Sequence, residues 1–303
     1  MKTYGAIEAG GTRWVCATVD ADGEIVARRV LPTTTPAETL AGAVAFFRQQ
    51  APPEALGVGA FGPLDLRPGS PTFGFVTTTP KAGWAYTDLV APLREALALP
   101  VALDTDVNAA AIGERRWGRG AGLSDFVYLT VGTGIGGGAF VNGELLRGIG
   151  HPEIGHMRIP HDRAADPFPG SCPYHGDCFE GLASGVALRE RWGSPAEELT
   201  DPAPWELEAD YLAAGLVNLT YALAPERIIV GGGVAKHPRL LALTRARMIE
   251  LLAGYLDHPG LADGLAEYVT APGLGDLSGV LGASELARGA AAGETIAALE
   301  KPA

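Results

Sequence analysis

The sequence predicts an α/β fold of two lobes with a cleft between them, and three observations support that prediction. Short apolar segments typical of strands alternate with helical segments along 303 residues, a length that allows two compact cores. Hydrophobic residues make up 47% of the chain and glycine contributes 42 residues, as in a globular enzyme rich in loops. A glycine-marked strand end recurs near the start of each half. We therefore expect a small N-terminal lobe at residues 1–117 and a larger lobe at residues 118–303, with a C-terminal helix that can pack back on the first lobe.

The first lobe begins with strands separated by turns. Asp22-Gly23, a dipeptide typical of hairpin turns, joins two of them. Thr35-Pro36-Ala37-Glu38 provides an N-cap, a proline at the first helical position and a glutamate at the third, so a helix begins here. The other expected elements are strands at residues 4–8, 14–19, 25–31, 56–61 and 101–103 and a helix at residues 108–117.

The second lobe begins near residues 118–120 with strands and then becomes mainly helical. Its helices are predicted from apolar residues that recur at helical spacing. The expected elements are strands at residues 126–131 and 227–230, a hairpin at residues 139–146, and helices at residues 207–223 and 238–256.

Three glycine-rich turns follow apolar strand segments: Gly10-Gly11-Thr12, residues 132–138 and residues 231–233. Glycine lets the backbone approach a phosphate closely and point N–H groups at it. A single turn of this kind is more often an ordinary tight turn, but three of them favour phosphate binding. The second turn matches the glycine spacing of a dinucleotide fingerprint, yet it leads into a strand rather than a helix. No lysine of the chain follows a glycine, so a Walker loop is excluded.

Asp104, Asp106 and Asn108 lie at the junction of a predicted strand and a predicted helix. A helix N-cap explains an acidic or amide side chain here without any chemistry. The functional alternative is that one carboxylate accepts a proton from an attacking hydroxyl, which contributes roughly 10²- to 10⁴-fold to a rate. The spacing alone does not choose between Asp104 and Asp106.

Cys172, His175 and Cys178 bring three soft metal ligands into seven residues. The alternative is a pair of ordinary buried cysteines or a redox pair, but the two cysteines are too far apart for C-x-x-C chemistry. With His156 as the fourth ligand, a zinc ion would be enclosed by protein and would be structural rather than catalytic. Further residues that could compete as ligands are His151, His161 and Asp177.

The formal net charge of -12 disfavours nucleic acid and anionic membranes as partners, because both carry negative charge. No stretch reaches 18 apolar residues, and the N-terminus lacks the apolar segment of a secretory signal. Three cysteines are too few for a disulfide framework, and Cys16 in an apolar strand is most simply a small buried hydrophobe. We therefore expect a cytoplasmic protein that binds neither nucleic acid nor membrane.

Together these motifs resemble those of the ROK family of sugar kinases, which has the two-lobed actin-like ATPase fold related to ribonuclease H. The resemblance spans nearly the whole chain. Residues 8–13 (Glu-Ala-Gly-Gly-Thr-Arg) resemble the first phosphate loop of the family, residues 131–138 the second, and residues 231–233 the loop on the adenosine side. The resemblance implies that ATP and Mg²⁺ are bound through Gly10, Gly11, Thr12, Thr133, Gly134, Gly231, Gly232 and Gly233.

The resemblance also implies the roles of the remaining motifs. Residues 104–110 match the segment whose second acid is the catalytic base, which selects Asp106. The implied sugar-binding residues are Asn108, Glu153, His156 and Glu180. The implied zinc ligands are His156, Cys172, His175 and Cys178. Because Glu153 and His156 are three residues apart, they face the same way in a helical turn, and zinc on His156 would fix Glu153 for the sugar.

Two motifs depart from the usual family pattern. The family normally carries Cys-x-Cys-Gly-x-x-Gly-Cys, whereas His175 takes one ligand place here, and Glu8 stands where the family usually has aspartate. Both variants are similar to the fructokinase branch of the family, as is the loop Thr79-Pro80-Lys81-Ala82-Gly83-Trp84.

The resemblance therefore implies an ATP-dependent hexose kinase that converts D-fructose to fructose 6-phosphate, with a homodimer as the family's expected assembly. Glucose, mannose or an N-acetylhexosamine is the alternative substrate, because a few hydroxyl contacts decide among hexoses. A non-catalytic sugar-responsive regulator is the alternative of another class, because the family includes repressors. Those repressors carry an N-terminal helix-turn-helix, whereas the phosphate loop here begins by Glu8, so we expect the kinase.

Overall fold

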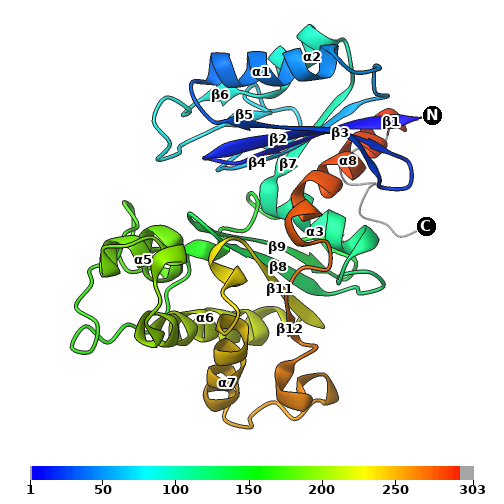
Figure 1. The fold of residues 1–303 in the computed structure, drawn as a ribbon. Helices are drawn as coiled ribbons and strands as arrows, with labels where there is room; N and C mark the ends of the chain where they lie inside the picture. The colour runs from blue at the N-terminus through cyan, green and yellow to red at the C-terminus, as the bar shows by residue number, and fades with distance from the viewer. Residues whose placement is uncertain (1, 294–303) are drawn as a thin grey trace. The chain divides into compact units, whose positions relative to one another are not determined.

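A computed structural model describes residues 2–293 of the chain, and the contacts within it define two compact units (Figure 1). Among these residues, the first unit comprises 2–121, 143–151 and 277–293, and the second comprises 122–142 and 152–276. The first unit is thus assembled from three stretches of the chain. Two of these stretches, 143–151 and 277–293, fall within the segment that the sequence assigns to the larger lobe.

The first unit holds a mixed sheet with the strand order β3-β2-β1-β4-β7. β1, β2 and β3 pair antiparallel, whereas β1, β4 and β7 run parallel to one another. The predicted strands of this sheet are all present: β1 (Thr3–Ala9), β2 (Arg13–Asp20), β3 (Ile25–Pro32), β4 (Leu56–Ala60) and β7 (Val101–Thr105). The short strands of the unit are β5 (Phe75–Val76) and β6 (Thr87–Asp88), which pair with each other, and β10 (Glu144–Leu145).

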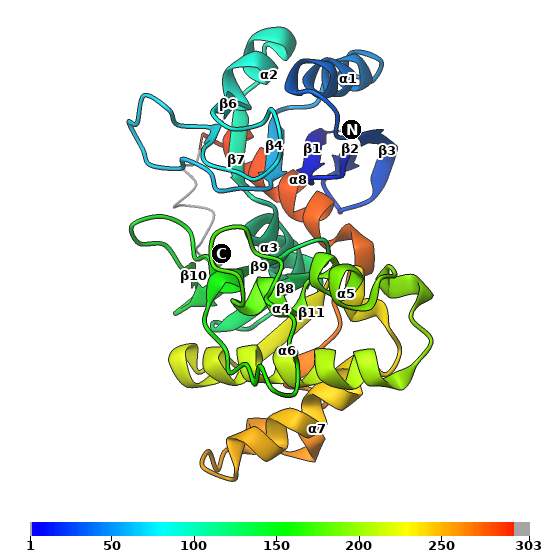
Figure 2. The same cartoon turned by 90° about the vertical axis from the view of Figure 1, so that its left-hand side faces the viewer.

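Helices cover both faces of this sheet (Figures 1 and 2). One face carries α1 (Pro36–Arg48) and α2 (Val90–Leu97), and the other carries α3 (Asp106–Trp117) and α8 (Ser278–Ala291). The core beneath α1 and α2 is formed by large apolar side chains that are almost completely buried, among them Ile7, Trp14, Phe46, Val58, Leu93 and Leu103. The predicted cap of α1 is confirmed, because the Thr35 hydroxyl accepts a hydrogen bond from the Glu38 N–H.

α8 packs very closely against α3 because both helices have glycine at the contact. A Cβ at Gly282 of α8 would collide with the carbonyl oxygen of Ala109, and a Cβ at Gly113 of α3 would collide with that of Ser278. At the start of α8, the Ser278 hydroxyl donates a 2.7 Å hydrogen bond to the fully buried carboxylate of Glu114. The C-terminal helix is therefore held in the first unit by backbone contact and by a buried polar pair.

The second unit is built on parallel strands with one antiparallel neighbour, in the order β9-β8-β11-β12. Its strands are β8 (Phe126–Val131), β9 (Ile135–Val141), β11 (Arg227–Gly231) and β12 (Val269–Thr270). Its α-helices are α4 (Phe179–Ala183), α5 (Gly185–Trp192), α6 (Pro202–Leu223) and α7 (Leu240–Leu252). Its short 3-10 turns include η1 (Ile154–His156) and η3 (Val234–Lys236). Across residues 2–293, every helix is too short or too polar to cross a bilayer.

The two long helices of the second unit differ in extent from the prediction. α6 begins at Pro202 rather than at residue 207, because Asp201 occupies the N-cap position and proline suits the first helical turn. α7 ends at Leu252 rather than at residue 256, because Ala253 and Gly254 adopt left-handed φ values of 50° and 70°. The Asp-Pro signal is visible in the sequence, whereas a left-handed alanine is not.

We predict that Gly282→Ala destabilises the protein by about 1–3 kcal/mol, because the new methyl group would push against the backbone of α3. Helix propensity alone predicts the opposite sign, since alanine is favoured over glycine within a helix by about 1 kcal/mol. Urea denaturation gives the free energy of unfolding, with Gly148→Ala as control because a Cβ there meets nothing within 4 Å. A stabilised Gly282→Ala variant would contradict the close packing of α8 on α3.

Candidate active site

Three parallel strands of the first unit end at the same edge of the sheet. Ala9 at the end of β1 pairs with Ala60 of β4, and Ala60 pairs with Thr105 of β7. The segments that follow these residues therefore share one edge, with Gly10-Gly11-Thr12 after β1 and Asp106 after β7. The carboxyl edge of parallel strands is where open α/β sheets bind ligands. This edge carries both the predicted first phosphate loop and the predicted base.

The loop at Gly10, Gly11 and Thr12 is held in place by Thr33. The Thr33 hydroxyl donates to the Gly10 carbonyl at 2.7 Å, and the Thr33 N–H donates to the Thr12 carbonyl at 3.0 Å. Within residues 2–293, the N–H groups of Gly11 and Thr12 have no hydrogen-bond acceptor. The loop therefore has fixed carbonyls and two N–H groups available for an anion.

Asp104 is fully buried and engaged on both carboxylate oxygens. Oδ1 accepts hydrogen bonds from the Thr105 N–H at 2.7 Å and from Asn108 Nδ2 at 2.8 Å. Oδ2 forms an ion pair with Arg147 Nη2 at 2.7 Å. A buried carboxylate with these partners holds the start of α3 in place.

Asp106, in contrast, lies at the first position of α3 with a partly exposed side chain. Its Oδ1 accepts the Val107 N–H at 2.9 Å, and its Oδ2 has no partner among the described residues. Desolvation by the surrounding protein raises the pKa of the Asp106 carboxyl to about 6. Of the two acids that the spacing leaves open, Asp106 is the one with a carboxylate oxygen available to a ligand.

Asn108 follows in the first turn of α3 and is almost completely buried. Its N–H donates to the Thr105 hydroxyl at 3.1 Å, and its amide nitrogen is engaged by Asp104. Its Oδ1 is buried and has no hydrogen-bond donor within the part of the chain that the structure describes. An unpaired buried amide oxygen is costly, so it is a candidate acceptor for a ligand hydroxyl.

The second unit has two glycine turns at one edge of its own sheet. β8 and β11 are parallel neighbours with Thr130 opposite Gly231, so residues 132–134 and 231–233 follow adjacent strand ends. Gly232 has a φ of 94°, and a Cβ there would collide with the backbone of Val131, so glycine is required. The structure thus brings the predicted second phosphate loop beside the predicted adenosine-side loop.

The turn at residues 132–134 has all three of its carbonyl groups engaged. The Gly132 carbonyl accepts the Gly185 N–H at 2.7 Å, the Thr133 carbonyl accepts the Val186 N–H at 3.4 Å, and the Gly134 carbonyl accepts the Gly132 N–H at 2.9 Å. The N–H groups of Thr133 and Gly134 have no acceptor within residues 2–293, and Thr133 is exposed. As at Gly11 and Thr12, the free groups are donors, which suits a phosphate.

Glu180 lies in α4 and contacts this turn directly. Its Oε2 accepts the Ile135 N–H at 2.9 Å, and a Cβ on Gly134 would lie only 2.5 Å from the same oxygen. The sequence indicates Glu180 only as a sugar-contact candidate. The structure adds a contact between its carboxylate and the predicted phosphate loop.

Glu153 immediately precedes the 3-10 turn η1, and His156 is the last residue of that turn. The His156 N–H donates to the Glu153 carbonyl at 3.0 Å, so the two residues are joined by one helical turn, as their spacing predicts. The Glu153 side chain is exposed. η1 is pressed against β9, because a Cβ at Gly155 would collide with the Ile135 carbonyl oxygen.

His156, Cys172, His175 and Cys178 form a cluster whose ligand atoms all lie within 4.8 Å of one another. The His156 Nδ1 lies 3.8 Å from the Cys172 Sγ and 3.6 Å from the Cys178 Sγ, and the His175 Nδ1 lies 3.6 Å from the Cys172 Sγ. Tetrahedral zinc with bonds of about 2.0–2.3 Å places its ligand atoms about 3.3–3.8 Å apart. The donor types and these three spacings therefore fit zinc.

The three residues that could compete as ligands are engaged elsewhere. Asp177 pairs with Arg158 and Arg163, each at 2.6 Å, and with His161 at 3.2 Å. His151 accepts the Leu64 N–H on its Nε2 at 3.1 Å. These contacts separate His151, His161 and Asp177 from the cluster.

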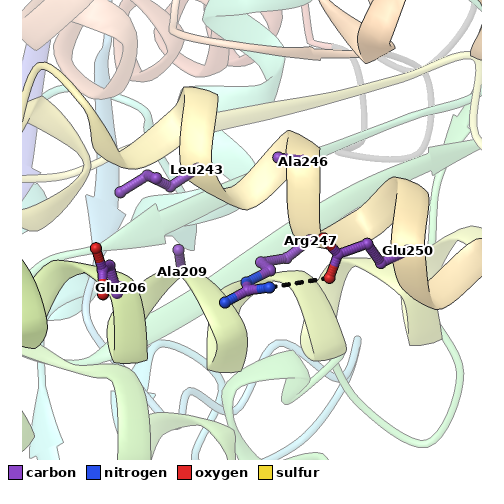
Figure 3. A pocket seen from close by; sticks show the side chains of 6 residues that line it. All are labelled: Glu206, Ala209, Leu243, Ala246, Arg247 and Glu250. Atoms are coloured by element: carbon purple, nitrogen blue, oxygen red, sulfur yellow. Dashed lines mark hydrogen bonds and ion pairs between the residues drawn. The ribbon is translucent and has the colours of Figure 1, made fainter.

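A separate hollow of about 160 Å³ lies between α6 and α7 (Figure 3). It is lined by Glu206, Ala209, Leu243, Ala246, Arg247 and Glu250. Arg247 binds Glu250 at 2.9 Å and Asp210 at 2.7 Å, so its guanidinium is already paired with acids. The residues that line this hollow are not among those predicted for the active site.

The predicted site residues belong to both units. Asp106 and Asn108 lie in the first, and the cluster ligands, Glu153 and Glu180 lie in the second. Sequence reasoning missed Thr33 and Arg147, which hold the first glycine loop and Asp104. Neither residue lies in a recognisable motif, because each acts through a contact that only the fold creates.

Comparison with known proteins agrees with this architecture. The family model described as ROK family matches residues 4–290. The fructokinase of Zymomonas mobilis is 45% identical over 298 residues, covering 94% of this chain and 96% of that protein. The fructokinase of Lactococcus lactis is 45% identical over 257 residues, covering 84% and 87%. The glucokinase of Halalkalibacterium halodurans is 29% identical over 332 residues, covering 95% of each.

A solved structure shows the same fold. The ROK family glucokinase from Streptomyces griseus, determined in complex with glucose and AMPPNP, matches with a TM-score of 0.77 at 28% identity. The match covers 94% of this chain and 99% of that one. The family match over most of the chain, the relatives at 45% identity and this fold together show that the chain belongs to the ROK family.

Proposed function

We propose that this protein is an ATP-dependent fructokinase that transfers the γ-phosphoryl group of ATP, bound with Mg²⁺, to the 6-hydroxyl of D-fructose. The difference in identity among the relatives carries the choice of substrate. Two named fructokinases are 45% identical to this chain, whereas a glucokinase of similar coverage is 29% identical. A kinase for glucose, mannose or an N-acetylhexosamine would use the same base and loops, so only a substrate panel separates these activities.

Asp106 is the proposed general base. Its carboxylate accepts the proton of the 6-hydroxyl while the new O–P bond forms, the bond from the γ-phosphorus to the β–γ bridging oxygen breaks, and ADP leaves. A pKa of about 6 keeps this carboxyl ionised at neutral pH and still basic enough to accept a proton. The buried ion pair of Asp104 with Arg147 supports a positioning role for the other acid.

The phosphates are proposed to bind the backbone donors of the glycine turns. The available N–H groups are those of Gly11, Thr12, Thr133 and Gly134. Fixed backbone dipoles stabilise the charge of a transferring phosphoryl group without reorganising. This arrangement suits a chain of net charge -12, because backbone donors supply local positive potential without a basic side chain. Residues 231–233 are proposed to bind on the adenosine side.

The sugar is proposed to bind Asn108, Glu153, His156 and Glu180. Asn108 offers the unpaired Oδ1, and Glu153 offers an exposed carboxylate. The Nδ1 of His156 faces the two cysteine sulfurs, which leaves Nε2 to donate to a hydroxyl. Carboxylate and imidazole groups of this kind fix the orientation of a polyol through paired hydrogen bonds.

Zinc is proposed to occupy the His156–Cys172–His175–Cys178 cluster. Four protein ligands leave no open position, so the ion would be structural. It would tie η1, which carries His156, to the loop that carries the other three ligands. Sugar-binding residues on both sides of the ion would then be held at a fixed separation.

We further propose that the protein acts in the cytoplasm as a homodimer. The reaction consumes ATP, and the thiols of Cys172 and Cys178 stay reduced in that compartment. The acidic charge of the chain is unsuited to binding anionic membranes.

We expect wild-type protein with ATP and Mg²⁺ to give its highest kcat/KM with fructose in a panel of fructose, glucose, mannose and N-acetylhexosamines. Asp106→Asn is expected to lower kcat by roughly 10²- to 10⁴-fold with little change in the KM for fructose, because only proton transfer is lost. Asp22→Asn, at an exposed turn, is the control. Full activity in Asp106→Asn would remove this residue as the base, and a different best sugar would overturn the proposed substrate.

The pKa of Asp106 also predicts the pH profile. The base works only when it is ionised, so kcat/KM should be level above about pH 7 and should fall tenfold per pH unit well below pH 6. Steady-state rates between pH 5 and 8 at fixed ionic strength measure this fall in kcat/KM. A fall in kcat/KM with its midpoint near pH 4, the ordinary range for an exposed aspartate, would contradict the desolvated setting of Asp106.

Purified protein is expected to contain one zinc per chain by plasma mass spectrometry. Cys178→Ser should lose the metal and lower Tm by roughly 5–10 °C, because binding energy at a structural zinc site contributes to folding. Cys16→Ser is the control, since Cys16 is buried in β2 of the other unit. Zinc retained in Cys178→Ser at the wild-type content would argue against this ligand set.

A further inference from the structure

The turn at Gly132, Thr133 and Gly134 depends on outside contacts for its conformation. It joins β8 to β9, and Val131 pairs with Ile135 across the three-residue connection. Its single internal backbone hydrogen bond, from the Gly132 N–H to the Gly134 carbonyl, cannot by itself fix where the Thr133 and Gly134 N–H groups point. Two glycines in three residues leave this backbone free to adopt several conformations. Neighbouring elements must therefore select one of them.

Two anchors hold the turn, one on each side. On one side the first residues of α5, Gly185 and Val186, donate to the carbonyls of Gly132 and Thr133. On the other side Glu180 accepts the Ile135 N–H at 2.9 Å through Oε2. This second bond is charge-assisted, so it is stronger than a neutral bond of the same geometry.

The Glu180 anchor is itself placed by a short, well-fixed segment. Glu180 lies two residues after the cluster residue Cys178, whose side chain is fully buried. The Phe179 N–H donates to the Met157 carbonyl at 2.9 Å, which ties the start of α4 to the residue after η1. η1 in turn packs on Ile135 through Gly155. Ile135, whose N–H donates to Glu180, is thus held from two directions.

We propose that Glu180 is a positioning residue for the nucleotide, in addition to its proposed contact with the sugar. By holding the Ile135 N–H, its carboxylate fixes the end of the turn so that the Thr133 and Gly134 N–H groups stay directed at the phosphates of ATP. The inference rests on the proposed function, because it takes residues 132–134 as a phosphate loop.

The negative charge of Glu180 distinguishes the positioning role from a contact with the sugar alone. A carboxylate near bound phosphates repels them, so a Glu180 that contacts only sugar predicts equal or tighter nucleotide binding once its charge is removed. A Glu180 that positions the turn predicts weaker binding when its hydrogen bond is lost. When Glu180 is truncated, the positioning role therefore predicts a higher Kd for the nucleotide, whereas a contact with sugar alone predicts an unchanged or lower Kd.

The experiment measures the Kd of Mg²⁺–AMPPNP by calorimetry in the absence of any sugar. Glu180→Ala is expected to raise this Kd about tenfold, the effect of losing one charge-assisted hydrogen bond. Glu180→Gln should stay within about threefold of wild type, because the amide oxygen can still accept the Ile135 N–H. Glu190→Ala, an exposed acid on α5, is the matched control and should bind as wild type does. Zinc content and Tm show that each variant retains the cluster and the fold.

An unchanged or lower Kd in Glu180→Ala, with only the KM for hexose raised, would overturn the inference. If Glu180→Ala does not fold, Glu180→Asp decides the question, because its carboxylate is one methylene too short to reach the Ile135 N–H and the same rise in Kd is expected. Wild-type protein that binds no nucleotide would instead refute the proposed function. Failure of this inference alone leaves wild-type binding intact.

Discussion

The register of the parallel strands is the constraint on which both units depend. In the first unit the pairing of Ala9, Ala60 and Thr105 brings the glycine loop and Asp106 to one edge. In the second, the pairing of Thr130 with Gly231 places two glycine turns side by side. A shift of one residue in either pairing would turn alternate side chains to the opposite face of the sheet. The chemistry of the protein is therefore tied to strand pairing made in its core.

The carboxylates near these edges have divided roles. Asp104 is neutralised by Arg147 and holds Asn108, and Glu180 holds the backbone of the second glycine turn. Asp106 lacks such partners, so its carboxyl keeps an available oxygen and a pKa raised by desolvation. Asp104, with both oxygens engaged, thus holds its surroundings, whereas the available oxygen and raised pKa of Asp106 are the features that support its proposed role in proton transfer.

Close backbone packing gives this arrangement its rigidity. α8 approaches α3 to backbone contact through Gly113 and Gly282, and η1 approaches β9 through Gly155. Side chains at these points would separate the elements and move the loops that they support. The zinc proposed for the His/Cys cluster would fix the surroundings of η1 in a different way, because metal ligands constrain direction as well as distance.

Much of the candidate site could be predicted from the sequence. Glycine turns after apolar strands, the acidic turn at residues 104–108 and the His/Cys segment are local patterns, and local chemistry dictates them. The N-cap at Thr35, the strands of the first sheet and β8 and β11 of the second followed from the same kind of signal. β12 was not predicted, and the left-handed end of α7 at Ala253 carried no signal. Resemblance to the ROK family then selected Asp106 from two acids that spacing could not separate.

Tertiary structure alone decided how those patterns are used. Arg147 reaches Asp104 and Thr33 reaches the first glycine loop through contacts between distant parts of the chain. The bond from Ile135 to Glu180 spans 45 residues, and the C-terminal α8 joins the first unit. The sequence determined which chemical groups the candidate site has, because residue types and their local spacing are properties of the sequence itself. Only the fold decided which of these groups remain available to a ligand. Availability depends on hydrogen-bond and ion-pair partners that strand pairing and helix packing bring from distant parts of the chain.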